Sequence, residues 1–202
     1  QNNAGKLFDF IPEGITLDFQ GRIINDNPDP DYKCFIDISK PVNVISSTKD
    51  AYIDLNTTAG SLLGENPGNR FTVSYGGSGS NISGIYLHNT QLWISNTSHV
   101  VFDNISVVVE DQRVGSGVGA TSVRDNSSYV LIKNSYFYTR NNGGSSSFVI
   151  AGAGLCTLDN NTIMAEGNVG NLVYLTTYNT GNNRYVNAYN NITNNKIYGP
   201  AT

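Results

Sequence analysis

Charged residues are scarce in this sequence. Only 14% of its 202 residues are Asp, Glu, Lys or Arg, so Asn, Ser and Thr must supply most of the polar surface. These three residue types favour turns, and Thr also favours strands, whereas all three are poor in helix interiors. Leu, Ala and Glu form no long run with a period of 3.6 residues, so the sequence predicts almost no α-helix.

Long apolar runs and basic clusters are also missing. No stretch of about 18 apolar residues occurs, so we expect no membrane insertion of this segment. The net charge is −4, whereas a nucleic-acid partner requires a basic face, so we expect no nucleic acid to bind. His88 and His99 stand apart from any ligand spacing typical of zinc, and we predict no metal and no cofactor.

Cysteine is nearly absent, with Cys34 and Cys156 as its two copies. Both lie in apolar, strand-like segments that the repeat described below separates by about 20 Å. A disulfide requires Cα atoms within about 7 Å of each other. We therefore predict two free, buried thiols.

What the sequence does contain is a short repeat of the form apolar-x-Asn-x-x-apolar. It occurs at residues 102–107, 132–137, 158–163 and 192–197. Recurrence at 20 to 50 residues is typical of solenoids and propellers. Few Asn-Gly or Asp-Gly hairpin signals accompany the repeat, which favours a solenoid over the four-stranded blades of a propeller.

The asparagine of the repeat suits the corner of a coil. Asn tolerates the left-handed backbone conformation of a tight turn, and the apolar residues on either side would end one strand and begin the next. We predict an all-β parallel solenoid of about seven coils. Stacked coils would align four amides as an internal ladder with rungs about 4.8 Å apart: Asn104, Asn134, Asn160 and Asn194. Residues 1–14 are expected to be an N-terminal lead-in or cap, and residues 15–202 the solenoid domain.

Candidate binding residues come from loops and from aromatic positions. Loops at residues 110–119 and 140–147 interrupt the coils, and loops on one side of a solenoid commonly form its binding face. Tyr136 and Tyr138 alternate with Phe137, which predicts an exposed tyrosine pair if Phe137 faces the core. Trp93 fits the core or the lining of a groove better than it fits a ligand platform. The candidate set is Tyr136, Tyr138, Trp93, Glu110, Arg113 and Arg140.

A catalytic interpretation is the alternative. Glycoside hydrolysis needs two carboxyl groups about 5–10 Å apart. Asp103 and Asp159 occupy equivalent corners, but Lys133 lies on the coil between them, which indicates an outward ladder of charges. The best remaining active-site group comprises Glu110, Asp111, Arg113, Arg124 and Asp125, although we favour its interpretation as solvated loop charge with an Arg–carboxylate clamp.

Four longer segments are more specific than the corners, namely residues 38–48, 56–64, 109–119 and 194–199. They resemble the adhesin-like surface proteins of host-associated methanogenic archaea, and the likeness runs from about residue 15 onward. The resemblance implies a right-handed, single-stranded parallel β-helix of the pectate-lyase-like superfamily. It also implies an archaeal, secreted protein attached to the cell surface through parts outside this segment.

The expected function follows from that resemblance. It is non-catalytic adhesion to a glycan or a surface protein of the host or of a neighbouring microbe, through loops on one side of the solenoid. A polysaccharide lyase or glycoside hydrolase on the same scaffold and a pure structural stalk are the alternatives. The resemblance carries no catalytic residues with it.

Overall fold

The computed structural model describes residues 10–26, 34–55, 70–112, 119–141, 146–180, 183–185 and 189–199. Almost all of the regular structure is strand, as the polar, helix-poor composition predicts. Three parallel sheets, named A, B and C below, make up the described chain. Within these ranges no helix is long or apolar enough to cross a bilayer.

Sheet A has seven strands. They are β1 (Thr16–Asp18), β4 (Asn43–Ile45), β7 (Asn81–Ser83), β10 (Val101–Asp103), β13 (Leu131–Lys133), β16 (Thr157–Asp159) and β21 (Asn191–Thr193).

Sheet B also has seven strands. They are β2 (Arg22–Ile24), β5 (Tyr52–Asp54), β8 (Tyr86–His88), β11 (Ser106–Gln112), β14 (Tyr136–Asn141), β17 (Thr162–Gly167) and β22 (Lys196–Tyr198).

Sheet C has six strands, and a separate antiparallel hairpin follows it. The sheet contains β3 (Phe35–Ile38), β6 (Arg70–Val73), β9 (Gln91–Ser95), β12 (Gly119–Arg124), β15 (Ser146–Ala151) and β18 (Asn171–Thr176). The hairpin consists of β19 (Tyr178–Thr180) and β20 (Asn183–Tyr185).

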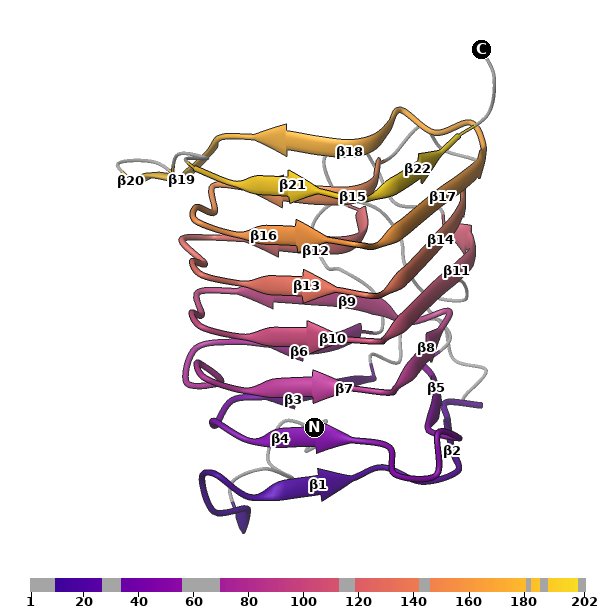
Figure 1. The fold of residues 1–202 in the computed structure, drawn as a ribbon, viewed down its shortest axis with the longest axis vertical. Helices are drawn as coiled ribbons and strands as arrows, with labels where there is room; N and C mark the ends of the chain where they lie inside the picture. Colours follow the sequence, from indigo (N-terminus) through magenta and orange to yellow (C-terminus); the bar gives the residue numbers. More distant parts are fainter. Residues whose placement is uncertain are drawn as a thin grey trace.

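The chain visits the three sheets in turn. β1, β2 and β3 belong to sheets A, B and C, and β4 returns to pair with β1 in parallel. The same order continues up the stack, so each strand lies beside one from the previous cycle (Figure 1). This arrangement is consistent with the predicted parallel β-helix.

The core is a set of apolar columns that run between the sheets. In sheet A, successive strands place Val44, Ile82, Phe102, Ile132 and Leu158 opposite one another, and all five are buried. Alternate residues of a strand point to opposite faces, so each three-residue strand in the middle of the stack buries its one central side chain. Complete burial of such a side chain stabilises the fold by about 1.5–3 kcal/mol.

The prediction that the four asparagines form an internal ladder is wrong, because the inward side chain at each corner belongs to the next residue. Asn104, Asn134, Asn160 and Asn194 do follow equivalent strands of sheet A, and their φ angles are 53°, 52°, 53° and 56°. All four are exposed, however, because the left-handed corner directs their side chains outward. Asn160 Nδ2 donates to Asn134 Oδ1 at 2.8 Å, and Asn134 Nδ2 donates to Asp103 Oδ1 at 2.8 Å. These four amides therefore form an outer column.

The inward position belongs to the residue after each asparagine. There Ser135 Oγ accepts from Ile105 N–H at 3.2 Å, and Asn161 Oδ1 accepts from Ser135 N–H at 3.0 Å. Asn195 Oδ1 continues the series by accepting from Asn161 N–H at 2.8 Å. The interior ladder thus satisfies backbone groups that the corner leaves without a strand partner.

The charged corner residues form an outward ladder, as the sequence indicates. Asp103, Lys133 and Asp159 lie opposite one another on β10, β13 and β16. Lys133 Nζ lies 3.2 Å from Asp103 Oδ2. A hydrogen bond from Asn134 lowers the pKa of Asp103, and burial opposes that shift slightly.

Both cysteines are free thiols. Cys156 is buried, whereas Cys34 is only partly buried, so the prediction of buried thiols is correct for Cys156 alone. Burial raises the pKa of each thiol.

Candidate functional site

The outward side of sheet B collects most of the aromatic and charged side chains that could bind a partner. Strand alternation buries Val107, Phe137 and Ile163, so their neighbours point outward. We call the outward side chains of sheet B the tyrosine face. It comprises Arg22, Ile24, Tyr52, Asp54, Tyr86, His88, Ser106, Val108, Glu110, Tyr136, Tyr138, Arg140, Thr162, Met164, Glu166, Lys196 and Tyr198.

A stack of rings forms the first column of this face. Strand pairing places Arg22, Tyr52 and Tyr86 opposite one another. The Arg22 guanidinium lies 4.5 Å from the centroid of the Tyr52 ring, and the Tyr52 and Tyr86 centroids are 5.3 Å apart. Contacts of these two kinds stabilise by about 0.5–1.5 kcal/mol each. The stack stops at Ser106, and Tyr136 lies one strand further along.

The second column contains a histidine between two carboxylates. His88 Nδ1 lies 2.8 Å from Asp54 Oδ2, and His88 Nε2 lies 3.6 Å from Glu110 Oε2. The Tyr52 hydroxyl also donates to Asp54 Oδ2, at 3.4 Å. His88 and Asp54 are partly buried, whereas the Glu110 side chain is 53% exposed. The imidazole therefore has an acidic partner at each nitrogen.

A second charged group surrounds Tyr138. Its hydroxyl donates to Glu166 Oε2 at 2.9 Å, and the Arg140 guanidinium donates to the same hydroxyl at 3.4 Å. Arg140 Nε lies 3.7 Å from Glu166 Oε2. Burial, with help from Glu166, raises the pKa of Tyr138, so the phenol stays neutral and keeps its proton. These contacts hold the Tyr138 ring in one orientation on the face.

Trp93 lies on a different sheet. It is an outward residue of β9, and the guanidinium carbons of Arg70 and Arg124 lie 4.9 and 4.8 Å from its ring centroid. Arg70 comes from β6 and Arg124 from β12, the two neighbours of β9 in sheet C. A cavity of about 280 Å³ adjoins it and includes Asp37, whose Oδ1 accepts from Ser74 Oγ at 2.7 Å. Trp93 therefore makes cation–π contacts with two arginines and lines a groove.

The structure brings together four of the six candidate residues. Tyr136, Tyr138, Glu110 and Arg140 come from adjacent strands β11 and β14 of the tyrosine face. Trp93 belongs to sheet C, and Arg113 lies outside the described residues. The alternative acidic group does not assemble either, because Glu110 meets His88 on sheet B whereas Arg124 contacts Trp93 on sheet C.

The sequence analysis missed Tyr52, Asp54, Tyr86, His88 and Glu166. A signal for the first four exists in the chain. Residues 51–54 and 85–88 share the pattern apolar-Tyr-apolar-polar, and residues 135–138 repeat its Tyr-apolar core. The pattern becomes visible once the strands of sheet B are aligned.

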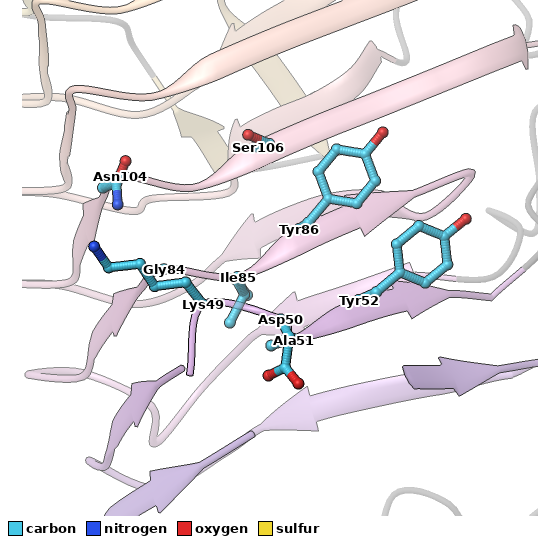
Figure 2. Close-up of a pocket in the computed structure, with 9 residues that line it drawn as sticks. All are labelled: Lys49, Asp50, Ala51, Tyr52, Gly84, Ile85, Tyr86, Asn104 and Ser106. Carbon is cyan, nitrogen blue, oxygen red and sulfur yellow. The ribbon is translucent and has the colours of Figure 1, made fainter. Parts of the chain in front are cut away.

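A cavity of about 450 Å³ opens at the corner between sheets A and B. It is lined by Lys49, Tyr52, Gly84, Tyr86, Asn104 and Ser106, among others (Figure 2). Figure 2 shows the two tyrosine rings side by side in similar orientation, with their hydroxyls pointing the same way. The cavity is continuous with the first column of the tyrosine face.

Four connections follow strands of sheet B. The chain segments at 27–33, 56–69, 113–118 and 142–145 each connect a strand of sheet B to the next strand of sheet C. They include the loop residues that the sequence analysis favoured for binding, and they lie outside the described residues. All four leave from the same edge of sheet B.

No cluster of three or more His, Cys, Asp or Glu in the described part of the chain could hold a metal ion. Comparison of the chain with protein-family models, with curated proteins and with solved structures found no match. The function therefore has to be argued from the geometry of this surface.

Proposed function

We propose that this chain is a non-catalytic adhesion module of a cell surface, which binds a glycan or a surface protein of a host or neighbouring microbe. The binding side would be the tyrosine face together with the connections that leave its edge. The observation that carries the proposal is the gathering of Tyr52, Tyr86, Tyr136 and Tyr138 on the outward side of one sheet. Tyrosine combines a large apolar ring with a hydroxyl, which suits the alternating CH and OH surfaces of sugars.

The energetic support comes from preorganisation. Ring stacking holds Tyr52 and Tyr86, and the Glu166 and Arg140 contacts hold Tyr138, so little side-chain entropy remains to be lost on binding. The face also has exposed charges that a polar partner could contact, from Glu110, Arg140 and Glu166. This combination of rigid rings with charged neighbours is typical of recognition surfaces.

The finer architecture belongs to the same proposal. Three-sheet stacking supports a right-handed, single-stranded parallel β-helix of about seven coils. Such a rod would form a segment of a longer surface protein, anchored elsewhere and extracellular. A solenoid suits this role because adding repeats lengthens the rod without a change of fold.

A glycan array with matched variants tests the proposal. We expect saturable binding by the wild-type chain, and at least about tenfold weaker binding by Tyr136→Ala and Tyr138→Ala. Tyr129→Ala is the control, because Tyr129 is 51% exposed and stacks on His99 away from sheet B. Absence of binding to any glycan or to whole microbial cells would leave the stalk alternative standing and refute adhesion.

A carbohydrate-active enzyme is the second candidate, favoured by the carboxylates on either side of His88. Asp54 and Glu110 approach opposite nitrogens of this ring, which resembles the pairing of acid and base that hydrolysis needs. Release of reducing ends or unsaturated uronides from polysaccharides, abolished by Glu110→Gln, would establish this alternative. Unchanged release in that variant would exclude the His88 group as its source.

A further inference from the structure

The ring stack of the tyrosine face has a gap the size of one more ring. Tyr86 and Tyr136 occupy the same column, with only Ser106 between them. Neighbouring strands lie about 4.8 Å apart, so the backbones of the two tyrosines are separated by about 9.6 Å. That separation is close to twice the 5.3 Å between the Tyr52 and Tyr86 ring centroids. A serine side chain fills little of this space, which opens into the 450 Å³ cavity.

Gly84 opens the same cavity from the corner. It takes the place in the corner column that asparagine holds in the next four strands of sheet A, and its φ of 69° is also left-handed. A Cβ at Gly84 would meet nothing closer than 3.5 Å, from the Ser46 carbonyl oxygen. There is thus room for a side chain here, although the left-handed φ restricts it to a residue such as Asn, and its absence leaves the space above Tyr86 accessible.

One end of the cavity carries a positive charge. Lys49 lines the cavity, and in the described chain no carboxylate lies within ion-pair distance of its ammonium group. Figure 2 shows the Lys49 side chain extending toward Asn104, at the end opposite the tyrosine hydroxyls. Asp50 also lines the cavity, but it accepts a hydrogen bond from Thr48, and its carboxylate points away from the Lys49 ammonium.

We propose that this cavity is a subsite for one six-membered sugar ring that carries an anionic group. The inference rests on the proposed glycan-binding function and adds its ligand class and position. The ring stacks on Tyr86 above Ser106, one of its hydroxyls reaches the Tyr86 hydroxyl, and its carboxylate or sulfate meets Lys49 and the Asn104 amide. A charge-assisted contact of this kind selects acidic over neutral sugars.

Two variants that fill the cavity distinguish a loss of binding from a loss of folding. Ser106→Tyr would extend the Tyr52–Tyr86 stack, and Gly84→Asn installs the residue that the fold uses at the equivalent corners. We expect each variant to keep or raise the melting temperature, because it adds contacts, and to weaken glycan binding at least about tenfold. Tyr129→Ala is the control, since Tyr129 stacks on His99 away from sheet B and the variant should bind like the wild type.

The preference for an anionic sugar is tested on an array that holds uronic-acid, sialylated and sulfated oligosaccharides beside neutral ones. We expect acidic glycans to bind best, Lys49→Gln to reduce that preference about tenfold, and Lys49→Arg to retain it. Wild-type binding that Ser106→Tyr and Gly84→Asn leave unchanged would overturn the subsite while the adhesion function stands. A preference for neutral sugars would overturn the anionic assignment, and no glycan binding at all would overturn both proposals.

Discussion

The adjacent residues Asn160 and Asn161 provide the sharpest test of the corner geometry. They are the same residue type, yet Asn160 is exposed and Asn161 is buried to 1% exposure. The Asn161 amide makes three hydrogen bonds, from Ser135 N–H at 3.0 Å and to Ile132 O and Asn195 Oδ1 at 2.9 Å each. Asn160 Nδ2 donates to Asn134 Oδ1 at 2.8 Å, and its side chain is exposed.

Asn161→Ala should therefore be costly. It removes three bonds worth about 1 kcal/mol each, and it leaves a buried backbone N–H and a buried carbonyl without their partner. Some of this loss is recovered if water enters the space, so we expect the free energy of unfolding to fall by roughly 3–5 kcal/mol. At about 2–4 °C per kcal/mol for a chain of this size, the melting temperature should drop by roughly 10 °C.

Asn160→Gly is the matched control. Glycine adopts the left-handed φ of 53° without strain, so the variant loses only an exposed side-chain bond and some backbone restriction. We expect a cost of at most about 1 kcal/mol. Thermal and urea unfolding followed by far-ultraviolet circular dichroism measure both variants. A larger loss for Asn160→Gly than for Asn161→Ala would refute the inward and outward assignment of this corner.

Three further predictions follow from individual side chains. A hydrogen bond from Asn134 lowers the folded-state pKa of Asp103, so the contribution of this carboxylate to stability is present above about pH 4 and is lost in acid. In a plot of the urea midpoint of unfolding against pH, Asp103→Asn should therefore reduce the fall below about pH 4. Cys156 is buried and its pKa is raised, so Ellman's reagent should label it at least about tenfold more slowly than Cys34; equal rates in the two single-cysteine variants would contradict its burial. Phe102→Ala should lower the free energy of unfolding by about 3–5 kcal/mol in the same denaturation assay, because Phe102 is fully buried, and a loss under 1 kcal/mol would contradict the core.

The repeat in the sequence was sufficient to predict parallel all-β structure, but its spacing did not reveal which way the amides point. The pattern apolar-x-Asn-x-x-apolar identifies the residue at each left-handed corner. The interior ladder changes residue type from Ser135 to Asn161 and Asn195, so it leaves no uniform sequence signal. The outer column is uniform because only Asn and Gly take that backbone conformation readily.

The tyrosine face shows a different limit of prediction from the sequence. Tyr136 and Tyr138 could be assigned to the outside from strand alternation with Phe137 alone. The hydrogen bond from Tyr138 to Glu166, and the stacking of Tyr52 on Tyr86, depend on which strands pair. The connections that separate those strands differ in length, and the one between β5 and β6 contains all of residues 56–69. No fixed period in the sequence therefore aligns the two tyrosines.

The amino-acid sequence by itself determined the class of structure. Scarce charge, abundant Asn and Ser, and apolar residues on either side of each left-handed corner exclude helices and require short strands that bury one side. Only the tertiary structure decided the register between strands and the direction of each corner side chain. The physical reason is that strand partners are remote in sequence, so the stack of rings, the gap at Ser106 and the opening at Gly84 exist only once four strands of sheet B lie side by side.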